Sequence, residues 1–194
     1  MSWFRKAAGD PLTVSMCSVK LGDRLLVVGC SDTVLAAALG AKAGLSGRAC
    51  LVCESEEERI RAAAAVEQAG VLVESFAAPF IALPFEDEAF DLVVLRNALP
   101  ALDASHRAPS VADVRRVVRP GGRCIAIDDA PPTGLAALVR GSGSGRGYTD
   151  TSGAAGLLAA AGFRGVRTLA QREALIFVEG VKPGLGDAAP TEPS

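Results

Sequence analysis

This 194-residue sequence has few aromatic residues and no excess of basic charge. Aromatics make up 5% of the chain, too few to build the stacking platforms that bind single-stranded nucleic acid. Twenty Lys and Arg face 22 Asp and Glu, for a net charge of −2, so no basic surface is expected to neutralise phosphates. The sequence therefore predicts that nucleic acid is not the partner.

Long apolar runs and numerous cysteines are also missing. The run Leu25–Cys30 is short, and Val34–Leu45 is interrupted by Lys42, whereas a membrane-spanning helix needs about 18 apolar residues. The N-terminal residues contain no apolar core of a secretory signal, which indicates a cytoplasmic protein without a membrane partner. Five cysteines, an odd number, then predict reduced thiols and no disulfide framework.

What the chain does contain is an alternation of short apolar segments and helical patterns. Near-continuous apolar runs suit strands that are buried on both faces of a parallel sheet, and the alternation predicts an α/β fold with a doubly wound sheet. The predicted strands are Arg24–Gly29, Arg48–Glu54, Phe90–Leu95 and Arg123–Asp128, with a weaker one at Val71–Ser75. The predicted helices are Asp32–Ala43, Glu56–Ala69, Val111–Arg119 and Ser152–Ala161.

The last third of the chain has a different pattern. Val166–Ala170 and Ala174–Val181 are separated by three residues, a spacing typical of an antiparallel hairpin. Gly141–Gly147, with the sequence GSGSGRG, is predicted to be a flexible loop. We expect residues 1–182 to form a single domain and residues 183–194, rich in Pro, Gly and Ala, to form a disordered tail.

A ligand site is expected beyond the carboxyl ends of the parallel strands. Gly29 ends the first strand and permits both a tight turn and a close backbone approach to a ligand. Glu54 ends the second strand, where an acid can accept two hydrogen bonds from a ribose diol. Spacing alone leaves open whether Glu54 binds ribose or only neighbours the start of the next helix, and Asp32 is expected to cap the helix after Gly29.

Two other motifs predict no chemistry. Cys50 and Cys53 form a C-x-x-C motif, but within a strand residues three apart point to opposite faces, so the pair is not expected to bind zinc or act as a redox motif. His106 is the one histidine and lacks a pattern of neighbouring ligands, so we expect a solvated loop residue and no metal site.

Three segments resemble the class I S-adenosylmethionine-dependent methyltransferases, in particular the small "type 11" group. LLVVGCSDT (Leu25–Thr33) is similar to the glycine-containing first motif of that family. ALPFEDEAFDLVVLRNAL (Ala82–Leu99) and VADVRRVVRPGGRCIAID (Val111–Asp128) resemble its two later structural motifs. The resemblance implies a Rossmann-like class I methyltransferase fold, a mostly parallel sheet of strand order 3-2-1-4-5-7-6, and an antiparallel C-terminal hairpin.

The resemblance also implies a cofactor, S-adenosylmethionine, and the residues that contact it. Those residues are Gly29, Ser31, Glu54, Phe80 and Arg96, although Phe80 can equally be a core residue; no catalytic residue is assigned. Several family positions are altered, so that the cofactor motif is degenerate. The acid of the first motif falls on Val27, its later glycines fall on Ser31 and Thr33, and the adenine-contacting Asp falls on Pro79.

Three functions are consistent with these residues. The first is a methyltransferase that acts without a metal, by proximity and orientation, on a small molecule or a protein. The second is a non-catalytic protein of methyltransferase fold that binds the cofactor weakly or not at all and acts as a binding or structural module. The third, a nicotinamide-dependent oxidoreductase, has one of the three glycines it needs. An open cleft beside Gly29 and Glu54 would favour the first, and one plugged by Thr33, Phe80 or Pro79 the second.

Overall fold

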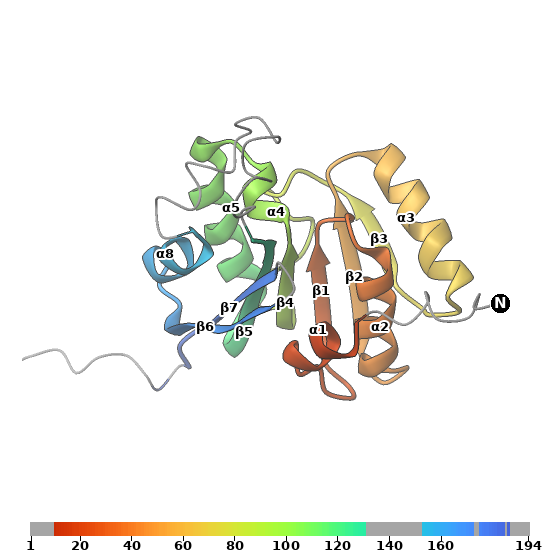
Figure 1. The fold of residues 1–194 in the computed structure, drawn as a ribbon, viewed down its shortest axis with the longest axis horizontal. Coiled ribbons are helices and arrows are strands. Elements are labelled where there is room, and N and C mark those ends of the chain that lie inside the picture. Colours follow the sequence, from red (N-terminus) through yellow and green to blue (C-terminus); the bar gives the residue numbers. More distant parts are fainter. Residues whose placement is uncertain (1–9, 131–152, 173–174, 185, 187–194) are drawn as a thin grey trace, which may run out of the picture.

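A seven-stranded sheet with helices on both faces forms the centre of the protein (Figure 1). The computed structural model describes residues 10–130, 153–172, 175–184 and 186. The helices are α1 (Pro11–Met16), α2 (Thr33–Ala43), α3 (Glu56–Gln68), α4 (Ala98–Ala101), α5 (Ala104–Val117) and α8 (Gly153–Ala160). The strands are β1 (Arg24–Val28), β2 (Arg48–Cys53), β3 (Glu74–Ala77), β4 (Phe90–Arg96), β5 (Val118–Asp129), β6 (Arg164–Arg172) and β7 (Leu175–Val181).

The strand order is β3-β2-β1-β4-β5-β7-β6. Strands β1 to β5 pair in parallel, whereas β7 is antiparallel to both β5 and β6. This arrangement confirms the predicted doubly wound, mostly parallel sheet, its order and its C-terminal antiparallel hairpin. Because β1 and β4 are central neighbours, the turns that leave their carboxyl ends lie side by side.

The two faces of the sheet bury two separate apolar clusters because successive side chains of a strand point in opposite directions. In β1, Leu25 and Val27 join the cluster formed with α1, α2 and α3. Leu26 and Val28 join the cluster formed with α4, α5 and α8. Figure 1 shows the two sets of helices on opposite sides of the sheet. Both faces are covered, which explains why the strand sequences are apolar throughout.

Several element bounds differ from those predicted. Strand β3 begins at Glu74 and not at Val71, because the chain leaves α3 through Gly70, at a φ of 70°, and reaches the sheet only at the residue paired with Cys50. Helix α5 begins at Ala104 in spite of Pro109, so His106, expected in a loop, lies exposed on this helix.

Residues 120–122, which separate the predicted helix Val111–Arg119 from the predicted strand Arg123–Asp128, lie within β5, where its pairing with β4 is irregular. Phe90 pairs with Val118 and Leu92 pairs with Arg123, so several residues of β5 face a single residue of β4. Gly121 takes a φ of 72°, which permits this local departure from regular strand geometry.

Two predictions fall on parts of the chain that the structure does not describe. The GSGSGRG loop, residues 141–147, lies outside the described residues, and so does most of the predicted tail at 183–194. Among the helices that are described, none is long and apolar enough to cross a membrane.

The carboxylate of Asp91, at the start of β4, joins three strands at the edge of the sheet where the strands begin. It accepts hydrogen bonds from the backbone amide of Arg24 at 2.7 Å and from its side-chain Nε at 3.2 Å, and it also bonds the guanidinium of Arg119. Burial raises the pKa of Asp91, but these hydrogen bonds, that of Arg119 first, outweigh burial and hold the pKa at about 2. The folded state therefore favours the ionised form of the Asp91 carboxylate.

Asp91→Asn is expected to lower the free energy of unfolding at pH 7 by about 1–2 kcal/mol, because a pKa below the ordinary 3.8 stabilises the folded state and solvent screens part of that effect. The stabilisation is complete above pH 3.8 and is lost as the pH falls through about 2. Urea titrations of the wild type and the variant should therefore converge near pH 2. Asp103→Asn, at an exposed helix start without a side-chain cap, is the control. A difference that stays constant with pH would show that the charge is not its origin.

Candidate cofactor site

A cavity of about 480 Å³ opens at the carboxyl ends of β1, β2 and β4. Its volume lies within the range of pockets that hold small molecules and cofactors. Its walls come from the turn after β1, the start and one face of α3, the segment after β3, and the start of α4. The lining residues are Gly29, Cys30, Ser31, Thr33, Glu54, Glu58, Arg61, Ala62, Ala65, Phe80, Arg96, Asn97, Ala98 and Ala101.

The turn after β1 passes directly over the end of β4. Gly29 has a φ of 103°, and a Cβ added there would collide with the backbone carbonyl oxygen of Arg96. Its amide donates to the carbonyl of Val52 at 3.0 Å, which ties the turn to β2 as well. Only glycine fits this position, and its bare backbone forms part of the cavity wall, as predicted.

Glu54 also lines the cavity, between the end of β2, the strand paired with β1, and the start of α3. Its side chain is exposed, and the cap of α3 is supplied by Ser55, whose hydroxyl accepts from the Glu58 amide at 3.2 Å. Partial desolvation raises the pKa of Glu54, and the negative charge of Glu58 raises it further. Glu54 therefore makes no helix cap, and it lines the cavity without a side-chain hydrogen bond to any residue that the structure describes.

Phe80 and Thr33 line the cavity without filling it. Phe80 is 4% exposed and belongs to the apolar cluster under α4 and α5, so it is both a core residue and a wall. Ser31 is exposed at the rim. Pro79 is exposed and is not one of the lining residues. The cleft beside Gly29 and Glu54 is thus open, as expected for a protein that binds a ligand there and not for one whose cleft is plugged by Thr33, Phe80 or Pro79.

Arg96 and Asn97 form the end of the cavity beside β4 and β5. The Arg96 guanidinium donates to Asp129 at 3.0 Å and lies 3.7 Å from Asp32, and its side chain is 12% exposed. Its Nε is buried and has no hydrogen bond to any residue that the structure describes. Asn97 binds Asp129 through both its amide nitrogen and its oxygen. As predicted, Asp32 caps α2, accepting from the Leu35 amide at 2.9 Å.

One of the altered family positions, Val27, makes no contact with the cavity. Val27 is 1% exposed, packs in the apolar cluster under α2, and does not line the cavity. This position therefore carries no acid, unlike the first motif of the family. The carboxylates near this end of the cavity are those of Asp32 and Asp129, which lie beside Arg96.

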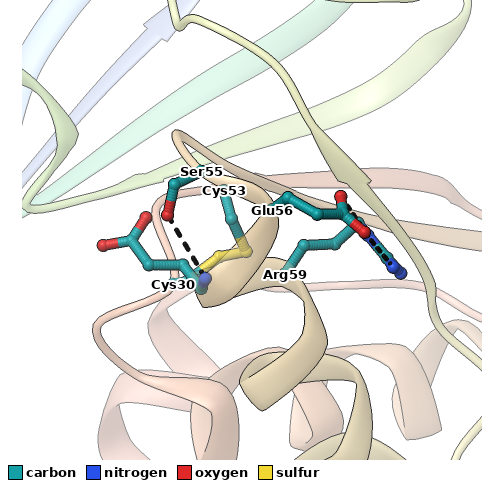
Figure 2. The surroundings of a disulfide bond; sticks show 6 residues. Cys30, Cys53, Ser55, Glu56 and Arg59 are labelled. Carbon is teal, nitrogen blue, oxygen red and sulfur yellow. Dashed lines mark hydrogen bonds and ion pairs between the residues drawn. A yellow bond between two sulfur atoms is a disulfide. The ribbon is translucent and has the colours of Figure 1, made fainter.

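The prediction that the cysteines would remain unpaired is wrong for two of them. Cys30 and Cys53 form a disulfide beside the first turn of α3 (Figure 2). They are 23 residues apart, but β1 and β2 are paired neighbours with Val28 opposite Val52, so the residues that follow meet. As predicted for a C-x-x-C motif within a strand, Cys50 and Cys53 lie on opposite faces of the sheet, in different apolar clusters.

Sequence reasoning missed the contribution of α3. Glu58, Arg61, Ala62 and Ala65 line the cavity, and their spacing of three and four residues marks one face of a helix. That periodicity was visible, but nothing in the sequence indicated that this face looks into a cleft and not into solvent. Among the described residues, no cluster of three or more His, Cys, Asp or Glu side chains is arranged to hold a metal ion.

Comparison with known proteins agrees with this geometry. The methyltransferase domain family matches residues 26–126, more than half of the chain. No curated protein sequence matches it. An S-adenosylmethionine-dependent methyltransferase from Aquifex aeolicus has a TM-score of 0.72 at 20% identity, over 93% of each chain. The YcgJ protein of Bacillus subtilis has a TM-score of 0.66 at 16% identity, over 89% of this chain and 97% of its own.

A third structure is a complex between the Haloferax volcanii Trm112 methyltransferase activator and a methyltransferase. One of its chains has a TM-score of 0.63 at 16% identity, over 89% of this chain and 88% of its own. At these identities the structural matches establish the fold, and the family match establishes descent. The chain belongs to the class I S-adenosylmethionine-dependent methyltransferase family.

Proposed function

We propose that the cleft binds S-adenosylmethionine and that the protein transfers its methyl group to a small-molecule acceptor without a metal. The observation that carries the proposal is the open cavity of about 480 Å³ that Gly29 and Glu54 line from the ends of two neighbouring strands. A nucleoside needs both a close backbone approach and an acceptor for its two ribose hydroxyls, and these two residues offer them.

Each remaining contact follows from the position of a residue in the cavity. Phe80 offers an aromatic face to adenine, and Ser31 offers a hydroxyl and a backbone amide beside the turn. Arg96 lines the cavity and is the cation we assign to the carboxylate of the methionine end, which would compete for it with Asp32, 3.7 Å from its Nε, and with Asp129. These assignments make the cofactor span the cavity from Phe80 and Glu54 to Arg96.

The bound cofactor supplies an electrophilic methyl group on a positively charged sulfur. The protein contributes by holding that group in line with the acceptor and by excluding water, a contribution that needs no Lewis acid. No side chain of the cavity is assigned as a catalytic base, so the acceptors that suit this site are soft or already ionised nucleophiles. A protein acceptor or an activating protein partner is the alternative to a free small molecule.

A second function is favoured by one observation, the loss of two polar contacts of the family. Val27 is buried in the core, and Pro79 is exposed and is not one of the residues that line the cavity. Each lost hydrogen bond to a charged group is worth roughly 1.5–3 kcal/mol, so losing two weakens binding by about 10² to 10⁴-fold. A protein so affected would keep the fold and act as a binding or structural module.

Glu54→Ala is expected to weaken S-adenosylhomocysteine binding by roughly 10- to 100-fold, because the ribose loses its charged acceptor. Isothermal titration calorimetry with S-adenosylmethionine and S-adenosylhomocysteine measures this directly. Glu67→Ala, at an exposed residue of α3 that does not line the cavity, is the matched control.

Measurable binding that Glu54→Ala reduces and Glu67→Ala leaves intact supports the transferase. Absence of binding to the wild type at millimolar ligand would overturn it in favour of the non-catalytic function. Binding that Glu54→Ala does not change would show that the nucleoside does not lie between Gly29 and Glu54.

A further inference from the structure

The disulfide lies within the two segments that form the nucleoside end of the cleft. Cys30 directly follows Gly29, and Cys53 directly precedes Glu54. The residues to which the proposed function assigns the backbone approach and the ribose contact are therefore each next to a bridged cysteine. Nothing else in the described chain joins the two walls covalently.

We propose that the Cys30–Cys53 disulfide is a reversible covalent modification of the cofactor cleft, closed when the site binds tightly and opened by thiols to weaken it. The proposal rests on the proposed function, because the ligand whose affinity changes is the nucleoside of that function.

The two sulfurs differ in how a reagent can reach them. Cys30 is partly exposed and lines the cavity, whereas Cys53 is 0% exposed and packs in the apolar cluster beneath. A thiolate from solution can therefore attack the Cys30 sulfur from the cavity side and release Cys53. A ligand that occupies the cavity covers the same sulfur. A bound ligand should therefore slow reduction. Because the reduced protein is expected to bind the ligand more weakly, linkage also requires that the ligand favour the closed disulfide at equilibrium.

The remaining three cysteines are not expected to compete in this chemistry. Cys17, Cys50 and Cys124 are free and buried. Burial raises the pKa of Cys17 to about 12 and that of Cys50 to about 11, and it raises the pKa of Cys124 as well. Since the thiolate is the reactive form, these thiols are inert near neutral pH. Redox chemistry is thereby confined to the pair at the cleft.

The oxidant that closes the bond is a low-molecular-weight disulfide such as oxidised glutathione. The Cys30 thiolate attacks one of its sulfurs, forms a mixed disulfide and releases one glutathione thiolate. The Cys53 thiolate then attacks the Cys30 sulfur and releases the second. The two protein thiols lose two electrons and two protons, and one glutathione disulfide becomes two glutathione thiols. Reduction by thiols runs the same steps backward.

The size of the effect follows from what the bond restrains. With the bond closed, the turn after β1 is held to β2 by the disulfide and by the hydrogen bond from Gly29 to Val52. With the disulfide open, the hydrogen bond from Gly29 to Val52 remains, but the residues that follow Gly29 regain backbone freedom. A ligand must order these residues again when it binds. Ordering one residue again corresponds to about a tenfold loss of affinity.

The test is calorimetric titration of the full chain with S-adenosylhomocysteine, once after oxidation by glutathione disulfide and once in excess dithiothreitol. Alkylation and mass spectrometry count the free thiols in each sample. The dissociation constant is expected to rise about tenfold on reduction. Cys50→Ala, a buried cysteine on the other face of β2, should keep that ratio, and Cys30→Ser should bind like the reduced protein in both conditions. Saturating ligand should also slow reduction of the wild-type disulfide, a readout that needs no variant.

The outcomes of these titrations separate the redox proposal from the proposed function. A reduction-dependent affinity together with protection by the ligand supports the proposal. Equal affinity in both redox states, or failure of glutathione disulfide to pair the two cysteines, overturns the proposal and leaves the proposed function intact. Absence of binding in both states overturns the proposed function, and the redox proposal fails with it.

Discussion

Gly29→Ala is expected to lower the free energy of unfolding by about 2–5 kcal/mol and to abolish binding of S-adenosylhomocysteine in the protein that remains folded. Alanine at a φ of 103° costs roughly 1–2 kcal/mol in backbone strain. The new Cβ also meets the carbonyl oxygen of Arg96, and relief requires β1 or β4 to shift, at a further cost of about 1–3 kcal/mol. Any such shift moves the cavity wall.

Gly70→Ala separates these two contributions. Gly70 also has a positive φ, 70°, but a Cβ there meets nothing within 4 Å. We therefore expect it to cost roughly 1–2 kcal/mol and to leave ligand binding unchanged. Denaturant titration followed by calorimetry on both variants makes the comparison. If the two variants are equally destabilised, the contact with Arg96 is not a constraint on the cleft.

Phe90→Ala is expected to lower the free energy of unfolding by about 3–5 kcal/mol while the folded fraction keeps its ligand affinity. Phe90 is 0% exposed, and its ring meets that of Phe85 edge to face, with centroids 4.9 Å apart. Phe85 in turn meets Phe76 at 5.0 Å. Phe90 starts β4, at the opposite end of the strand from the cavity, so its removal empties the core without moving the site.

Two further variants calibrate that result. Phe90→Leu keeps most of the volume and should cost less than about 1.5 kcal/mol. Ile60→Ala, at a side chain that is 55% exposed on α3, should change stability by no more than about 0.5 kcal/mol. A loss of affinity in folded Phe90→Ala would show that core packing and the cleft are coupled.

The sheet could be predicted from the sequence because its evidence is local. The apolar runs of β1, β2, β4 and β5 are buried on both faces, and this burial needs the same residue type at every position. The position of β3 was predicted three residues too early, because Val71 and Val73 pack against the core before the backbone begins to pair at Glu74. The start of α5 was missed because its first two turns are polar and contain Pro109.

The site could be predicted in part. Gly29 and Glu54 were identifiable because strand ends and turn glycines have fixed positions in a parallel sheet, and both line the cavity. The α3 face and the Cys30–Cys53 pair were not identifiable. Their proximity depends on the register that places Val28 opposite Val52, and sequence patterns leave that register open. Residues brought together by pairing across the sheet need the structure.

The two outer strands determine how copies of the chain behave at high concentration. Strand β3 has only four residues, and the carboxylate of Glu74 at its start is held by Arg48 at 2.8 and 2.9 Å. Strand β6, at the other border, carries Arg167 bound to Glu179. Charged side chains and a short border strand disfavour the joining of sheets between molecules. We therefore expect these features to disfavour strand addition at the two borders.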